Sequence, residues 1–189
     1  MNEYELDYNT FIGGWFIPEN VVDGVLSLVK KNKDISVPGI VSGGLIKEIK
    51  DSEDIKIAPD YSESEILEYR NYLQKCLELY VKRYETVNST NDKFNITEPI
   101  IYQYYKPGGG FKMWHNERGG IINSKRLLVF MTYLNDVDDG GTLFKNFRLT
   151  TPAKKGLTLI WPTDWPWAHK SQISYTKEKH IITGWYNFI

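Results

Sequence analysis

The sequence predicts an α+β fold in which helices come first and a β-rich module follows. Two segments before residue 95 place apolar side chains at helical spacing, whereas short β-branched or aromatic runs dominate after residue 96. Glycine- and proline-rich turns separate those runs, a spacing typical of a β-sandwich or barrel. With 189 residues, 41% of them hydrophobic, the chain can bury the core of one domain. We therefore expect a single domain, with residues 1–95 as helical support and residues 96–189 as the β core.

The first predicted helix covers residues 18–33, "PENVVDGVLSLVKKNK". It opens with a proline and an acid and ends in lysines, as helix termini prefer. Its apolar side chains at helical spacing are Val21, Val22, Val25, Leu26, Leu28 and Val29. The glycines and prolines of residues 34–60 predict loops and short strands.

The second predicted helix begins at a capping box, the pair Ser62 and Glu65. One face of this helix carries Ile66, Tyr69, Leu73, Cys76, Leu77, Tyr80 and Tyr84. Because Cys76 lies on that apolar face, we expect it to pack in the core rather than act as a nucleophile. As the only cysteine, it cannot form a disulfide within the chain.

Four apolar runs predict strands in the β module: "TEPIIYQYY", "RLLVFMTYLNDV", "LTLIWP" and "KHIITGWYNF". Between them, "KPGGG", "DDGG" and "TPAKKG" have the composition of turns. All three histidines of the chain fall within this module.

The stretch "HNE" at residues 115–117 suggests a metal site. In an extended segment, Phe111, Met113, His115 and Glu117 would share one mostly apolar face. A carboxylate that points into an apolar interior is costly unless it is paired or binds a metal. His169, in a Pro- and Trp-rich loop after "LTLIWP", is the better candidate for a third ligand. Two histidines and one carboxylate form the facial triad of non-haem Fe(II) oxygenases.

Several motifs follow one another between Tyr105 and Trp185. They are "YKPGGGF", "HNE", "RLLVFMTYLNDVDDGGTLF", "TPAKKGLTLIW", His169, a lysine ten residues later (Lys179) and Trp185. In this order they resemble the prolyl 4-hydroxylase-like branch of the Fe(II)/2-oxoglutarate-dependent dioxygenases. Residues 1–95 carry no such motif, although a helical N-terminal portion suits that family.

The resemblance implies a double-stranded β-helix core, also called a jelly roll or cupin-like fold, with the N-terminal helices packed on it. It also implies that His115, Glu117 and His169 hold Fe(II) at the catalytic centre. The family's usual carboxylate ligand is an aspartate, so Glu117 is one methylene longer.

Further residues would bind the cosubstrate if the resemblance holds. Lys179 would pair with the distal carboxylate of 2-oxoglutarate, with help from the Tyr105 hydroxyl, and Trp185 would form a wall of the pocket. Lys177 has the same strand parity, but the ten-residue spacing favours Lys179, and we expect Lys177 to be a solvated charge. His180 takes the opposite face of the strand, where we expect a structural role.

Other departures from the family pattern lie close to the motifs. One extra residue separates Gly108 from His115, and "GGT" lacks the acid that usually intervenes. Val129 stands where prolyl hydroxylases often carry a threonine. We therefore expect the cosubstrate contacts to differ in detail.

The implied activity consumes 2-oxoglutarate and O2, with ascorbate as a supporting reductant, and releases succinate and CO2. The implied substrate is a proline or another side chain in a peptide or protein. The segment "WPTDWPW" could form an aromatic groove for an extended proline-containing peptide, or it could pack as a rigid loop. Two alternatives stay open: a non-catalytic β-helix binding module, and a cupin-type enzyme that uses another metal such as zinc.

Charge and hydropathy limit the partners. The net charge is −1 with acids and bases interspersed, so we expect no nucleic-acid partner. The N-terminus lacks the basic and apolar regions of a secretory signal, and no apolar run is long enough to span a membrane. We therefore expect a cytoplasmic protein without a membrane partner.

Overall fold

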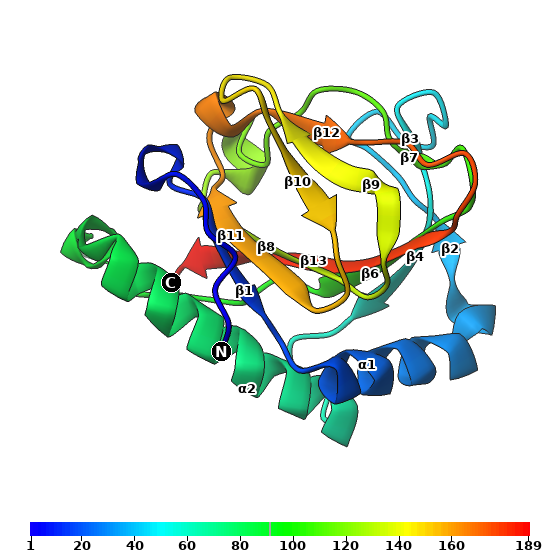
Figure 1. Ribbon diagram of the computed structural model, residues 1–189, viewed down its shortest axis with the longest axis horizontal. Helices are drawn as coiled ribbons and strands as arrows, with labels where there is room; N and C mark the ends of the chain where they lie inside the picture. Colours follow the sequence, from blue (N-terminus) through cyan, green and yellow to red (C-terminus); the bar gives the residue numbers. More distant parts are fainter. Residues whose placement is uncertain (91) are drawn as a thin grey trace.

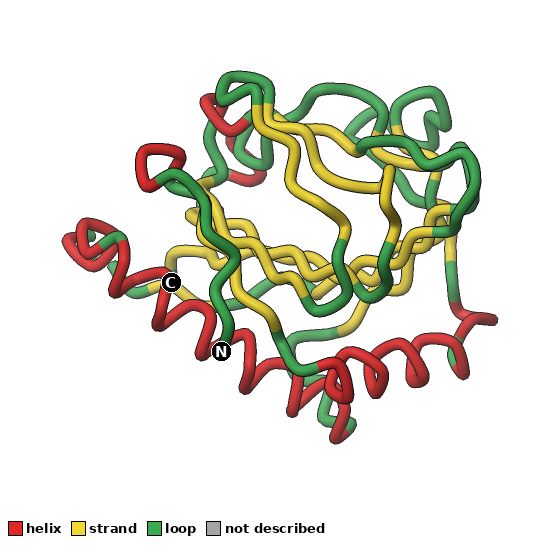
Figure 2. The backbone as a smooth tube through the Cα atoms, viewed as in Figure 1, coloured by secondary structure: helices red, strands yellow, loops and turns green. Residues whose placement is uncertain are grey.

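Two facing β-sheets and two helices make up most of the structure (Figure 1), a computed structural model that describes residues 1–90 and 92–189. The helices lie together on the outer side of the larger sheet, and the smaller sheet lies on the other side (Figure 2). The larger sheet therefore separates the helices from the space between the sheets.

Both predicted helices are present, α1 at Glu19–Lys31 and α2 at Ser64–Arg83. Their buried side chains all lie on the predicted faces, although Leu26 and Leu28 of the predicted α1 face are only partly buried. The predicted capping box is wrong. Helix α2 begins one residue later than expected, with Glu63 at the N-cap and no side-chain cap, and Ser64 donates to the Glu65 carboxylate instead. Short 3-10 helices occur at Tyr8–Thr10, Lys33–Ile35, Glu85–Ser89, Ile121–Asn123 and Trp165–Trp167.

The larger sheet is antiparallel and has eight strands. Across the sheet these are β1 (Gly13–Phe16), β11 (Leu157–Pro162), β8 (Arg126–Tyr133), β13 (Lys179–Phe188), β6 (Ile100–Tyr105), β4 (Glu53–Ile57) and β2 (Val37–Pro38), and β5 (Phe94–Asn95) pairs with β13. The predicted apolar runs supply its central strands, and the N-terminal half adds β1, β4 and β2 as well as the helices.

The smaller sheet has the order β10 (Leu149–Ala153), β9 (Val137–Phe144) and β12 (His169–Ser171). A separate pair joins β3 (Lys50–Asp51) to β7 (Gly110–Phe111). The prediction of a turn at "DDGG" is wrong, because these residues lie inside β9. A Cβ at Gly141 would lie 2.0 Å from the Thr151 carbonyl oxygen, so the glycine permits a close strand approach here. The segment "TPAKKG" is also partly strand, since its first three residues belong to β10.

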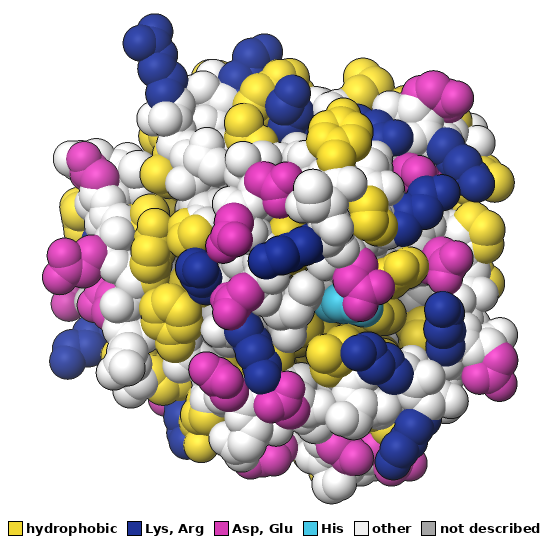
Figure 3. Space-filling view, turned by 45° about the vertical axis from the view of Figure 1, so that its right-hand side comes forward, with side chains coloured by type: hydrophobic (Ala, Val, Ile, Leu, Met, Phe, Trp, Pro, Cys, Tyr) yellow, Lys and Arg dark blue, Asp and Glu magenta, His cyan; other side chains and the backbone are white. Residues whose placement is uncertain are grey.

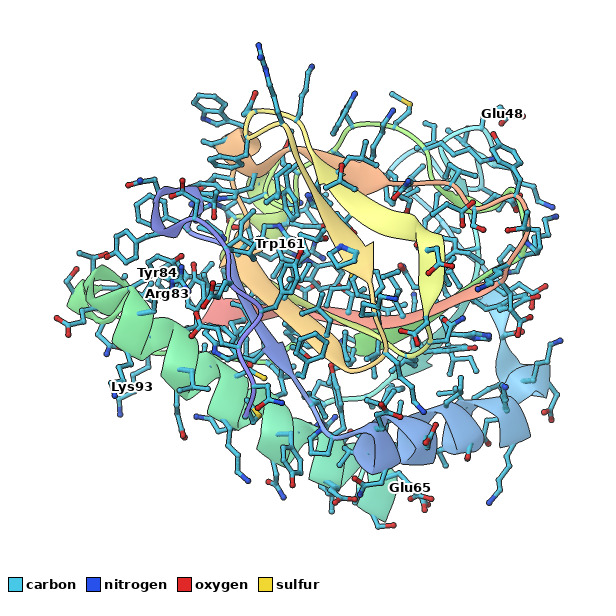
Figure 4. The ribbon with its side chains drawn as sticks, viewed as in Figure 1. Glu48, Glu65, Arg83, Tyr84, Lys93 and Trp161 are labelled. Atoms are coloured by element: carbon cyan, nitrogen blue, oxygen red, sulfur yellow. The ribbon has the colours of Figure 1, made fainter. Side chains whose placement is uncertain are left out.

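Two apolar cores lie on the two faces of the larger sheet. The outer core joins the helices to the sheet and contains Leu73 and Cys76. Burial raises the pKa of the Cys76 thiol to about 12, as expected for a core residue. The inner core fills part of the space between the sheets and includes Trp161, which is labelled in Figure 4. Trp161 packs edge-on against Phe144. Among the described residues, neither helix combines the length and the apolar character needed to cross a membrane.

Candidate metal centre

Backbone hydrogen bonds bring together the three predicted metal ligands. His115 and His169 form an isolated antiparallel bridge, in which each amide donates to the carbonyl of the other, at 3.0 and 2.9 Å. The amide of Glu117 donates to the Thr163 carbonyl at 3.1 Å, just beyond β11. One ligand atom from each of the three side chains lies within 4.8 Å of the others. His169 opens strand β12, which pairs with β9, where the sequence predicted a loop.

The alternating face predicted for residues 111–117 is present only in part. Phe111 stacks on the His115 ring, with centroids 3.5 Å apart, and Glu117 approaches the same imidazole. Met113 is 51% exposed, so its predicted place on the inward face is wrong. The physical reason is a bend at Met113, which interrupts the extended backbone between β7 and His115.

Both imidazoles are oriented for coordination through Nε2. Nδ1 of His115 lies 3.1 Å from the Met113 carbonyl oxygen, and Nδ1 of His169 lies 2.9 Å from that of Trp167. A carbonyl oxygen can only accept a hydrogen bond, so Nδ1 must be the donor in each contact. The neutral ring therefore carries its proton on Nδ1, and Nε2 is left with a lone pair for a metal. The two Nε2 atoms each lie 3.5 Å from Oε1 of Glu117.

Burial and charge act in opposite directions on this group. Burial alone would raise the pKa of Glu117, but the favourable interaction of its carboxylate with the His115 and His169 side chains outweighs burial and holds the pKa well below its usual range. Burial and the neighbouring His115 lower the pKa of His169, against the pull of Glu117. The site therefore presents an ionised carboxylate and a neutral imidazole, the forms that bind a metal.

The second oxygen of Glu117 points into the protein. Oε2 accepts a hydrogen bond of 3.0 Å from the Trp185 indole and a longer contact of 3.5 Å from Arg126. Arg126 in turn forms a two-pronged ion pair with Glu98 at 2.9 and 2.6 Å. Trp185, predicted as a wall of the pocket, therefore also contacts a proposed ligand. Sequence reasoning missed the roles of Arg126 and Glu98, because a charged residue at a strand end is usually solvated.

A cavity of about 470 Å³ lies next to the three ligands, between the two sheets. Its lining includes all three ligands and Tyr105, Phe111, Thr142, Trp161, Thr183 and Trp185. Figure 3 shows that Lys or Arg side chains and Asp or Glu side chains are interspersed over one face of the molecule. The cavity can accommodate a small cosubstrate beside the ligands and part of a second molecule.

Lys179 lies on the inner side of β13, as its strand parity predicts. Its Nζ is buried and donates to the carbonyls of Gly140, at 2.9 Å, and Gln172, at 3.2 Å. Burial lowers its pKa to about 8, although Asp139 partly offsets the effect. Lys177, by contrast, is exposed and lies 3.6 Å from Asp138, as expected for a solvated charge.

Tyr105 is buried and lines the cavity, and its hydroxyl donates to Oε1 of Gln103 at 2.6 Å. His180 faces away from the cavity, where Nδ1 lies 2.6 Å from the Tyr102 hydroxyl and Nε2 lies 3.1 Å from Glu178. These contacts agree with the structural role expected for His180. In the segment "WPTDWPW", Trp165 is 74% exposed, whereas the Trp167 indole donates to the Thr10 carbonyl at 2.7 Å.

The sequence matches no family model, and no curated protein matches it significantly. The structure, however, is similar to solved prolyl hydroxylases. A prolyl 4-hydroxylase from Pseudomonas putida matches with a TM-score of 0.71 at 15% identity, over 94% of this chain and 92% of that one.

Two further enzymes have similar structures. A viral collagen prolyl hydroxylase from Paramecium Bursaria Chlorella virus-1, solved with 2-oxoglutarate, matches with a TM-score of 0.70 at 19% identity, over 95% and 97% of the two chains. A prolyl hydroxylase from Trichoplax adhaerens, solved with a peptide fragment of hypoxia inducible factor, gives 0.72 at 18% identity, over 94% and 84%. The chain therefore has the fold of the prolyl 4-hydroxylases over nearly its whole length.

Proposed function

We propose that this chain is an Fe(II)- and 2-oxoglutarate-dependent dioxygenase that hydroxylates a proline, or another side chain, in a peptide or protein. Residues 1–189 would act as one catalytic domain with a double-stranded β-helix core. The observation that carries the proposal is the convergence of His115, Glu117 and His169 beside a cavity between the sheets.

The donor set fits Fe(II). Two imidazole nitrogens and one carboxylate oxygen, all on one side of the site, are the ligands of the non-haem iron oxygenases. Both Nε2 atoms face Oε1 of Glu117 at 3.5 Å, longer than a hydrogen bond, as expected around a space for an ion. When bound together, Fe(II) and 2-oxoglutarate would supply oxidative decarboxylation with O2 as the oxidant, one oxygen atom going to succinate and the other to the hydroxylated product, with release of CO2.

The remaining residues would bind and orient the cosubstrate. Lys179 is a buried cation whose present partners are neutral carbonyls, so a carboxylate would be a stronger partner. Tyr105 lies in register with Lys179 across β6 and β13 and could donate to the same carboxylate. The apolar and aromatic walls of the cavity would exclude water around the bound cosubstrate.

The peptide substrate is proposed by similarity, because one structural neighbour is a prolyl hydroxylase in complex with a peptide. The exposed Trp165, in the "WPTDWPW" segment next to the site, supports contact with an extended, proline-containing chain.

An anaerobic optical titration tests the proposal. We expect a visible charge-transfer band when the apoprotein receives both Fe(II) and 2-oxoglutarate, and no band with either alone. Oxygen and proline-containing peptides would then give succinate and peptides that gain one oxygen atom. Metal binding without the band would contradict the proposal and favour the cupin-type alternative with zinc. No metal binding at all would favour the non-catalytic module.

A further inference from the structure

Glu117 has one more rotatable bond than the aspartate of the family pattern, so its carboxylate needs firmer positioning. Free rotation would let both oxygens reach a metal, or neither, and ordering a long polar side chain costs entropy. The structure holds the carboxylate with its two oxygens in different environments. Oε1 faces the two histidines, whereas Oε2 accepts the Trp185 indole hydrogen bond at 3.0 Å.

Trp185 is itself held in place by Arg126. The guanidinium carbon of Arg126 lies 3.5 Å from the centre of the Trp185 ring, a stacked cation–π contact. Nη1 of the same arginine donates to the backbone carbonyl of Glu117, at 3.2 Å, and approaches Oε2, at 3.5 Å. Arg126 therefore contacts the tryptophan, the ligand's side chain and the ligand's backbone.

Glu98 fixes Arg126 from the other side. Its two oxygens accept from Nε and Nη2 of Arg126, at 2.9 and 2.6 Å, in the two-pronged geometry that restricts a guanidinium most strongly. The three residues come from separate segments, since Glu98 precedes β6, Arg126 opens β8 and Trp185 lies in β13. Arg126 and Trp185 contact the Glu117 carboxylate directly and Glu98 acts through Arg126, an arrangement that exists only in the folded sheet.

We propose that three positioning residues present Oε1 of Glu117 alone to the metal. We call these residues, Glu98, Arg126 and Trp185, the Glu117 clamp. The clamp engages Oε2 and so compensates for the extra methylene of the glutamate. This inference rests on the proposed metal site, but it requires only that a divalent ion binds there.

The test measures the affinity of the apoprotein for Mn(II) by calorimetry, which needs neither 2-oxoglutarate nor turnover. Trp185→Phe keeps the ring under Arg126 but removes the indole N–H, and we expect metal affinity to fall about 10- to 100-fold, as for other partners of ligands. Glu98→Gln should lower it in the same direction by a smaller factor. Trp15→Phe and Glu3→Gln are the matched controls. Trp15 is buried in the outer core and Glu3 pairs with Arg83, both away from the cavity, so both variants should bind Mn(II) like the parent.

A double-variant comparison isolates the role of the extra methylene. In a Glu117→Asp background the shorter carboxylate should no longer reach the indole, so adding Trp185→Phe should change the affinity less than about twofold. Unchanged affinity in Trp185→Phe alone, or an equal loss in both backgrounds, would overturn the proposal. If Glu117→Asp binds no metal, the single variants decide the matter.

Two further readouts separate the clamp from other causes. The unfolding midpoint of each apoprotein shows whether a variant only destabilises the fold. If a control variant lost as much metal affinity and as much stability as the clamp variants, a specific role for the clamp would be contradicted. If the parent protein bound Mn(II) but gave no charge-transfer band with Fe(II) and 2-oxoglutarate, the proposed function would be refuted. The clamp would still be tested by the Mn(II) affinities of its variants.

Discussion

Lys179 and Tyr105 face each other across β13 and β6, with Nζ of the lysine 5.3 Å from the centre of the tyrosine ring. Both side chains are buried, and burial raises the pKa of Tyr105 well above its usual range, with smaller effects from Asp54 and Glu117. The tyrosine therefore stays a neutral hydrogen-bond donor beside a potential cation, an arrangement suited to a carboxylate.

Replacing Lys179 by methionine should weaken 2-oxoglutarate binding roughly 10- to 150-fold, the loss expected for one charge-assisted hydrogen bond. Methionine has a similar length and is apolar, so the buried position stays filled. The charge-transfer titration measures the change. Lys177→Met is the control and should bind like the parent, because Lys177 is exposed and lies in the bend before β13. Equal behaviour of the two variants would refute the assignment of Lys179.

The affinity for 2-oxoglutarate should fall as the pH rises through about 8. Burial lowers the pKa of Lys179 to about 8, so the ammonium form that would bind the carboxylate is lost above that value. Above this pH, the affinity should fall by up to about tenfold per pH unit until it approaches that of Lys179→Met. Titrations at several pH values check the slope. If Lys179→Met showed the same slope, the pH dependence of the affinity would belong to another group.

Gly110→Ala should destabilise the protein by about 1–3 kcal/mol and weaken metal binding as well. Gly110 has a φ of 156°, and a Cβ there would lie 2.3 Å from Cδ1 of Ile173. It precedes Phe111, whose ring supports His115, so a local shift should reach the ligand. Gly120→Ala is the control, because Gly120 is extended and has no neighbour within 4 Å of an added Cβ. Chemical denaturation and calorimetry provide the two measurements.

Leu73→Ala should lower the free energy of unfolding by about 2–5 kcal/mol, since it opens a cavity between α2 and the larger sheet. Leu73 is 1% exposed. Leu67→Ala, on the 45% exposed Leu67 of the same helix, should change stability by less than about 0.5 kcal/mol. Urea denaturation of both variants checks the contrast, and similar losses would argue against a core role for this face of α2.

Much of the fold could be predicted from local patterns. The faces of both helices, the central strands and the core position of Cys76 follow from which side chains recur at periods of 3.6 and 2. The exact start of α2 did not follow, because Glu63 takes the N-cap position without a side-chain hydrogen bond and Ser62 is left outside the helix. The prediction of a turn at "DDGG" was also wrong. Glycine favours turns, but here it allows β9 and β10 to approach closely.

The candidate residues for binding a metal and an anionic cosubstrate could be identified without coordinates, because their chemical types and their order along the chain are visible in the sequence. His115, Glu117, His169 and Lys179 were recognisable in this way. The way in which Glu117 is held required the folded structure, since no local pattern links Glu98, Arg126 and Trp185 to Glu117 along the chain. Their contacts exist only after three strands have paired, and pairing between distant strands depends on packing of the whole sheet rather than on local propensity.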